Sequence, residues 1–245
     1  MPTRAVHLVI DAADQHGLAE FGARALDWVV GEDDGDEADV WPAGFSYPSP
    51  EALPLAFIPV PGLKGGKNRV HLDLASRSAQ HQAALVDKVL GLGAARVDIG
   101  QGDVPWAVLA DPEGNEFCVL EPRSDYLDTG PVAAVVIDSP DPQAGAAFWE
   151  LAAGWPPQAS EPDFASLRSP AGTGPFLEFL RSADPKVVKN RLHVDVAPPA
   201  GGDVRAETAR LTGAGARPAD IGQGEVGWVV LADPQGNEFC VLSAR

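Results

Sequence analysis

A close internal repeat is the sequence feature that most constrains the fold. Residues 98–120 read DIGQGDVPWAVLADPEGNEFCVL, and residues 220–242 read DIGQGEVGWVVLADPQGNEFCVL. Residues 68–123 align with residues 190–245 without a gap, and the preceding halves match more weakly, with Asp11 and Phe21 falling on Asp138 and Phe148. The chain is therefore predicted to be a duplication of a unit of about 120 residues.

Each unit divides again into strands and one helix per half. Short β-branched and apolar runs predict strands over 5–11, 53–60, 69–74, 106–110 and 116–120. Helical spacing of apolar residues predicts helices over 14–28 and 78–92, and the second unit repeats the pattern with strands at 132–138 and 191–196 and helices near 143–153 and 203–212. The order β-α-β-β-β is thus expected four times, which indicates an α+β fold.

Two local segments carry their own interpretations. Pro54 and Pro59 flank the run at 53–60 and favour an edge strand or irregular pairing. The acidic run EDDGDEAD at 32–39 is interpreted as a solvated loop. In the repeat alignment, Trp149 stands where the first unit has Gly22, so this tryptophan is assigned either to the core or to an interface.

Composition limits the classes of function. No apolar run approaches the roughly 18 residues of a membrane span, and the N-terminus lacks a signal-peptide pattern, so we expect a soluble cytoplasmic protein. The net charge of −17, from 18 Lys+Arg against 35 Asp+Glu, argues against nucleic-acid binding, which requires a basic surface. Cys118 and Cys240 occupy matching positions in the two repeats and are expected to be free thiols in a reducing compartment.

The repeated motifs resemble a known superfamily. KNRVHLDL at 67–74, KNRLHVDV at 189–196 and the two LADPxGNEFCVL segments resemble the vicinal oxygen chelate superfamily, which includes glyoxalase I, extradiol dioxygenases, and fosfomycin- and bleomycin-resistance proteins. The strongest likeness is to the bacterial proteins with a glyoxalase-like domain. The resemblance extends over the whole chain, and it is specific for fold rather than for reaction.

The resemblance implies an architecture of cupped sheets. In the superfamily two βαβββ modules pair into a cupped, eight-stranded mixed sheet with helices on its outer face, and the cup holds the active site. This chain would form two glyoxalase-like domains, 1–123 (modules about 1–66 and 67–123) and 124–245 (modules about 124–188 and 189–245). Either neighbouring modules pair, or the first pairs with the fourth and the second with the third. A small-molecule ligand is implied, with the chain a monomer or a homodimer.

The same resemblance places candidate metal ligands on the first and last strand of each module. The residues at these positions able to bind a metal are His7, His71, Cys118, Glu178, His193 and Cys240. The two remaining positions hold Ala56 and Ala134, so either module pairing leaves one ligand missing per cup and departs from the usual two-His, two-carboxylate set. Thiolate with imidazole would favour Zn²⁺ or Fe²⁺. Alternatively, the histidines hydrogen-bond within the cup wall and the thiols act as small buried hydrophobes.

Strand alternation predicts which side chains line the cups. Side chains two apart share a face, and the apolar set should pack on the helices. The polar set expected in the cups is His71, Asp73, Glu116, His193, Asp195 and Glu238. Trp106 and Trp228 would line the mouths of the cups or pack against a helix.

Two functions fit these patterns. One is a metal-free protein that binds or sequesters a small organic molecule, with carboxylates that attract a cationic ligand. The other is a divalent-metal-dependent lyase, isomerase or dioxygenase, in which the metal acts as a Lewis acid on vicinal oxygens.

Overall fold

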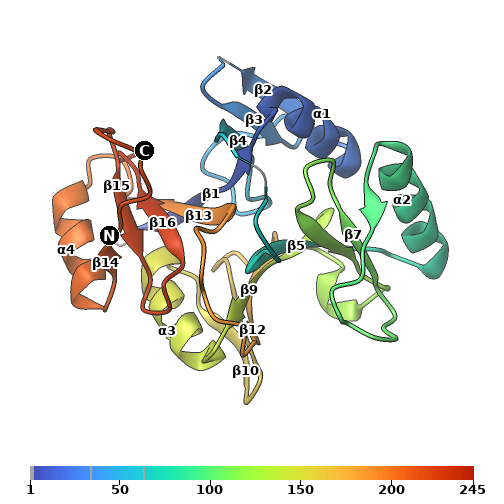
Figure 1. The fold of residues 1–245 in the computed structure, drawn as a ribbon. Helices are drawn as coiled ribbons and strands as arrows, with labels where there is room; N and C mark the ends of the chain where they lie inside the picture. Colours follow the sequence, from blue (N-terminus) through green and yellow to red (C-terminus); the bar gives the residue numbers. More distant parts are fainter. Residues whose placement is uncertain (1–2, 34, 63) are drawn as a thin grey trace.

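Two eight-stranded mixed sheets and four helices make up the computed structural model, which describes residues 3–33, 35–62 and 64–245 (Figure 1). The first module contains β1 (Arg4–Ala12), α1 (Gln15–Leu26), β2 (Val29–Asp33), β3 (Ala38–Trp41) and β4 (Leu55–Pro59). The second contains β5 (Val70–Leu74), α2 (Ala79–Gly91), β6 (Ala95–Arg96), β7 (Ala107–Ala110) and β8 (Glu116–Val119).

The second repeat has the same order of elements. A short 3₁₀ turn, η1 (Ser124–Tyr126), joins it to the first repeat. The third module contains β9 (Val132–Ser139), α3 (Pro142–Ala153), β10 (Pro157–Glu161), β11 (Phe164–Arg168) and β12 (Phe176–Arg181). The fourth contains β13 (Leu192–Ala197), α4 (Val204–Gly213), β14 (Arg217–Pro218), β15 (Val229–Ala232) and β16 (Glu238–Val241). The predicted β-α-β-β-β order is confirmed in all four modules.

Each helix begins at a side-chain cap. Asp14, Ser78, Asp141 and Asp203 each accept a hydrogen bond from a backbone N–H of the first helical turn. Such caps satisfy amide groups that have no partner within the helix. None of the helices in the described ranges is long and apolar enough to cross a bilayer.

The modules pair in the crossed arrangement. One sheet has the strand order β14-β15-β16-β13-β1-β4-β3-β2 and joins the fourth module to the first; the other, β10-β11-β12-β9-β5-β8-β7-β6, joins the third to the second. We call their concave faces cup A and cup B, respectively. β1 pairs antiparallel with β13, and β5 with β9, so each sheet takes one module from each repeat. In Figure 1 the blue and orange-red modules share one sheet, and the green and yellow modules share the other.

The helix-facing sides of both sheets form one continuous core. Leu8, Phe117 and Leu192 belong to this core, and the partly buried Leu72 packs against it, as the strand alternation predicts. Small separate clusters lie around Cys240 on one sheet and Cys118 on the other. The helices therefore pack on one face of each sheet, and the opposite faces are left to form the cups.

Two local predictions are wrong. Residues 32–39 are not a loop throughout, because β2 extends to Asp33 and β3 begins at Ala38, while Asp34 lies outside the described residues. The strand β4 is not at an edge, since β1 and β3 flank it on either side. Its prolines are tolerated because Pro54 precedes the strand, where its carbonyl accepts from the Leu8 N–H, and Pro59 is its last residue.

Hydrogen bonds between the KNR segments (67–69 and 189–191) and the DPxGN turns (111–115 and 233–237) hold the two repeats together; we call these contacts braces. Asn68 Nδ2 and Arg191 Nε both donate to Asn115 Oδ1, at 3.1 and 3.0 Å. The counterpart Asn237 Oδ1 accepts from Asn190 Nδ2 at 3.1 Å and from Arg69 Nε at 3.4 Å. These motifs hold the turn of one repeat to the strand start of the other, which fixes the relative position of the two cups.

Candidate functional site

Three polar side chains converge at the centre of cup A. On the antiparallel pair β1·β13, His7 lies opposite Asp195, and its Nε2 is 3.1 Å from Asp195 Oδ2. His193 Nε2 lies 3.4 Å from Asp195 Oδ1. This oxygen also accepts the backbone N–H of Cys240 at 3.0 Å. The Asp195 carboxylate therefore bridges two imidazoles and fixes the last strand of the module.

Burial and the Asp195 charge set the protonation states in cup A. Burial lowers the pKa of His7, but the hydrogen bond and charge of Asp195 outweigh it, so the pKa of His7 is raised. Burial dominates at His193 and lowers its pKa. Burial would raise the pKa of Asp195, but the hydrogen bond from His7 and the charges of both histidines lower it. In cup A, Asp195 therefore favours protonation of His7, whereas burial disfavours protonation of His193.

The thiol of cup A is held in its neutral form. Cys240 Sγ lies 3.7 Å from His193 Nε2. Burial, followed by the negative charge of Asp195, strongly raises the pKa of Cys240. In the absence of a metal the thiol is therefore no nucleophile, and it acts as a small buried group.

Two carboxylates that the sequence analysis assigned to a solvated loop face cup A. Glu37 lines the cup, and Asp39, on β3, pairs in register with Ala56 on β4. Donor atoms of His7, Glu37 and Asp39 lie within 4.8 Å of one another. The carboxylate missing at Ala56 is thus replaced from the neighbouring strand. The two-residue spacing of Glu37 and Asp39 is the signal that could have indicated a shared strand face.

Cup A opens into a pocket of about 570 Å³. Its polar floor is formed by His7, His193 and Asp195. Trp228 lines the pocket and is 44% exposed, as expected of a residue at its mouth. The volume lies within the range of about 300–1,000 Å³ typical of small-molecule sites.

Cup B contains the second set of predicted residues. His71, Asp73 and Cys118 have donor atoms within 4.8 Å of one another. His71 pairs with Val136 on β9, and Glu178 pairs with the same Val136 from the other side, so the two lie in one row across the sheet. The structure therefore brings His71 and Cys118 together and places Glu178, the third residue expected for crossed pairing, in the same row as His71 with Val136 between them.

The segment between the repeats covers cup B. The Tyr126 hydroxyl donates to Glu178 Oε1 at 2.9 Å, and the ring packs edge-on against Phe176. The Arg123 guanidinium lies 5.6 Å from the Trp106 ring centroid. Tyr126 and Trp106 both pack on the cluster that contains Cys118. Tyr126 was not singled out from the sequence, because it lies outside the repeat.

Burial controls the ionisation of cup B. Burial, reinforced by the charge of Asp73, raises the pKa of Glu178 to about 7 despite the Tyr126 hydrogen bond, which lowers it. Burial also strongly raises the pKa of Cys118, with Asp73 adding to the effect. Burial lowers the pKa of His71, but the interaction with Asp73 outweighs it and raises that pKa.

Glu116 and Glu238 are engaged outside the cups. Glu116 accepts from Lys64 Nζ at 2.6 Å and from the Asn68 backbone N–H at 3.1 Å. Glu238 makes the equivalent contacts, with Lys186 at 2.8 Å and Asn190 at 3.1 Å. Both glutamates therefore contact the segments that precede β5 and β13. These contacts are separate from His71 and His193, with which strand alternation grouped them.

The donor set of cup A fits a divalent cation of borderline softness. It offers imidazole, carboxylate and thiol groups, and His193, Asp195 and Cys240 have donor atoms within 4.8 Å. The buried Nδ1 of His193 has no hydrogen-bond partner among the described residues. Two imidazoles with nearby carboxylates are a common ligand set for Zn²⁺ and Fe²⁺.

Solved structures with the same arrangement of elements span nearly the whole chain. Glyoxalase I from Zea mays matches with a TM-score of 0.63 at 14% identity, over 98% of this chain and 92% of that chain. A putative dioxygenase from Bacillus subtilis matches with a TM-score of 0.62 at 12% identity, over 99% of this chain and 85% of that chain. These identities show a shared fold alone. A comparison with curated proteins gives no match.

The family model for the glyoxalase-like domain matches twice, over residues 7–120 and 134–242. Both matches contain the KNR segment, the DPxGN turn and the cup-facing strands described above. The predicted resemblance to the vicinal oxygen chelate superfamily is confirmed by these matches and by the shared fold. The chain belongs to the glyoxalase-like domain family, of which it contains two tandem copies.

Proposed function

We propose that cup A binds a small organic cation with a flat ring, and that the protein acts by sequestering this molecule. The observation that carries the proposal is the pocket of about 570 Å³ with His7, Asp195 and the exposed Trp228 in its wall. Cup B, whose centre is in contact with Tyr126, would serve the fold rather than ligand binding.

The charge of the pocket supports a cationic ligand. Glu37, Asp39 and Asp195 place three carboxylates around His7, and the charges of all three raise its pKa. Two cationic side chains line the pocket, Lys189 and Arg245. Lys189 forms an ion pair with Asp11, which compensates its charge, so Arg245 sets one positive charge against the three carboxylates. An amine could therefore replace the His7 proton as the partner of these carboxylates, while an aromatic ring stacks on Trp228.

A ligand screen with paired variants tests this proposal. We expect flat organic cations to bind the wild-type protein in calorimetric titrations, and binding to weaken about 10-fold or more in Asp195→Asn and Trp228→Ala. The matched variants Asp73→Asn and Trp106→Ala alter the same positions in cup B and should leave affinity unchanged. Equal losses in both sets of variants would contradict the assignment to cup A.

A metal-dependent lyase, isomerase or dioxygenase is the second candidate, and the unpartnered Nδ1 of His193 favours it. His7 and His193, with Asp39 or Glu37, would hold the metal, which would act as a Lewis acid toward substrate oxygens. Asp195 would orient the His7 ring, and Trp228 would cover the substrate. Purified wild-type protein would then carry stoichiometric metal that His7→Ala and His193→Ala both lose, whereas His81→Ala, on α2, retains it. No bound metal after loading with Zn²⁺, Fe²⁺ or Mn²⁺ would eliminate this candidate.

We further propose a cytoplasmic location and a division into the two sequence units 1–123 and 124–245. The two buried free thiols support a reducing compartment. The two family matches, each within one unit, support the division.

A further inference from the structure

The two repeats differ at one helix position that faces the core. Gly22 on α1 is the counterpart of Trp149 on α3, and the adjacent phenylalanines occupy equivalent places. The Phe21 and Phe117 ring centroids are 6.2 Å apart, and their counterparts Phe148 and Phe239 are 5.7 Å apart, both edge-to-face. The surroundings of the two positions are therefore alike, and only the second carries a side chain.

In the second repeat the indole of Trp149 fills this space. It is 1% exposed, and its centroid lies 5.4 Å from that of Phe239. Its Nε1–H donates to Asp233 Oδ2 at 3.1 Å. Asp233, the first residue of the DPxGN turn, is itself only 3% exposed.

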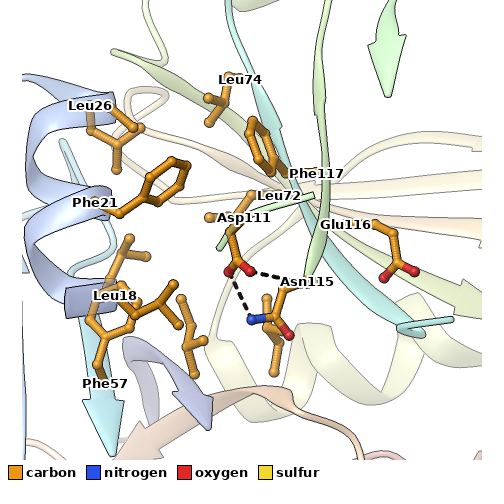
Figure 2. A pocket seen from close by; sticks show the side chains of 15 residues that line it. Leu18, Phe21, Leu26, Phe57, Leu72, Leu74, Asp111, Asn115, Glu116 and Phe117 are labelled. Carbon is orange, nitrogen blue, oxygen red and sulfur yellow. Dashed lines mark hydrogen bonds between the residues drawn. The ribbon is translucent and has the colours of Figure 1, made fainter. Parts of the chain in front are cut away.

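In the first repeat the same space is a cavity of about 60 Å³. Its wall is almost entirely apolar and includes Leu18, Phe21, Leu26, Leu72, Leu74 and Phe117 (Figure 2). Asp111 also lines this cavity, as Figure 2 shows. It is the equivalent of Asp233, whose carboxylate accepts the hydrogen bond from the Trp149 indole. Asp111 Oδ2 accepts from Asn115 Nδ2 at 2.8 Å, and among the described residues it has no second donor of the kind that Trp149 gives to Asp233.

Neighbouring substitutions make the cavity smaller than an indole. Leu18 and Leu26 stand where the second repeat has Gly145 and Ala153, so they occupy part of the space that Gly22 leaves. About 10–15 Å³ of such volume holds one water-sized atom, so about 60 Å³ accommodates about five non-hydrogen atoms. This is the size of a five-membered aromatic ring.

We propose that the cavity beneath α1 binds a five-membered aromatic ring bearing an N–H group, either alone or as the end of a larger ligand, with the N–H donating to Asp111. The second repeat supplies the template, since the pyrrole half of the Trp149 indole makes this contact with Asp233. The site lies on the helix side of the sheets, away from both cups, and is independent of the function proposed for cup A.

Titration with pyrrole, followed by protein NMR, tests the proposal. Pyrrole should shift the amide signals of Leu72, Leu74 and Phe117 saturably in the wild-type protein. Furan, which has the same ring without a donor, should bind at least about 10-fold more weakly, as expected when a hydrogen bond to a charged acceptor is lost. Absence of a saturable shift with pyrrole, or equal affinity for furan, would overturn the proposal.

Two variants exchange the properties of the repeats. The triple variant Leu18→Gly, Gly22→Trp and Leu26→Ala transfers the α3 set to α1 and should abolish pyrrole binding. The single change Gly22→Trp is less suitable, because a Cβ at Gly22 would lie 3.0 Å from Phe57 Cζ. The reciprocal variant Trp149→Gly should create a site beside Asp233 and gain stabilisation by indole. Undiminished pyrrole binding by a folded triple variant would overturn the proposal, as would indole stabilisation of Trp149→Gly without pyrrole binding by the wild type.

Discussion

The two cups differ in electrostatics because cup B has an alanine, Ala134, where cup A has His7. His7 on β1 corresponds to Ala134 on β9, and both lie opposite the aspartate of the pairing strand. Asp195 therefore has the His7 imidazole as a partner, whereas the buried Oδ1 of Asp73 has no hydrogen bond among the described residues and lies 3.5 Å from His71. The charge of Asp73 adds to the burial that raises the pKa of Glu178.

Glu178 should make stability fall as the pH rises. Its pKa is raised from 4.5 to about 7, so between these values the folded state binds more protons than the unfolded state. Between pH about 4.5 and about 7, the unfolding free energy of the wild type should therefore fall by about 3 kcal/mol. The variant Glu178→Gln should not show this loss. Urea unfolding followed by circular dichroism at both pH values measures the difference. Parallel pH profiles for the two proteins would contradict this assignment.

His7 should also make stability fall as the pH rises, in the range above 6.5. Its pKa is raised by Asp195, so its stabilising contribution is complete below the unfolded value of 6.5 and is lost as the pH rises through the folded value. His7→Gln should cost about 1–3 kcal/mol at low pH, and this cost should shrink above the folded pKa. Urea unfolding at several pH values tests this, with His81→Gln as the control. A cost that does not vary with pH would contradict an ionised His7–Asp195 pair.

At the scale of elements, the repeated motifs act as braces. The DPxGN segment forms a turn, in which the Gly114 N–H donates to the Asp111 carbonyl, and Pro and Gly-Asn at those positions have the local conformational preferences for it. Its long-range contact could not be predicted, since the Arg191 that reaches Asn115 lies in the other repeat. Strand alternation groups His71 with Asp73, and in the structure donor atoms of both lie close to Cys118. The same rule grouped them with Glu116, whose long side chain instead turns to Lys64.

Removing one brace should destabilise the molecule. Arg191 donates to Asn115 and to Glu113 Oε2 at 2.7 Å, with both charged side chains largely buried. Arg191→Ala removes one donor from each acceptor and leaves the largely buried Glu113 carboxylate without its cation, so we expect a loss of about 2–4 kcal/mol in unfolding free energy. Arg205→Ala, on the exposed face of α4, should cost less than about 0.5 kcal/mol. Thermal and urea unfolding measure both variants, and equal effects would show that the brace contributes nothing.

For the whole molecule, crossed pairing makes each sheet depend on both repeats. Adjacent and crossed pairing satisfy the same strand alternation, because the first strands β1, β5, β9 and β13 carry similar apolar faces. The sequence therefore predicted two cups but left the pairing open. It is settled by long-range contacts, β1 with β13 and β5 with β9. The pairing in turn places Glu37 and Asp39 in the same cup as His193.

Separated repeats should not fold as monomers. The fragment 1–123 would expose the pairing edges of both β1 and β5, which are filled by the second repeat in the intact chain. We expect each half alone to be unfolded or self-associated, and an equimolar mixture to give a complex with the spectrum of the intact chain. Light scattering with circular dichroism checks this. A monomeric, fully folded 1–123 fragment would contradict the crossed arrangement.

The assignment of ligand binding to cup A is tested most directly by the indole N–H signals of the tryptophans. In a titration of labelled protein with a flat organic cation, with peaks assigned by Trp228→Phe and Trp106→Phe, the Trp228 signal should shift saturably while the Trp106 signal stays in place. This response should disappear in Asp195→Asn and persist in Asp73→Asn. A shift of Trp106 with Trp228 unmoved, or a response that depends on Asp73 rather than Asp195, would contradict the assignment.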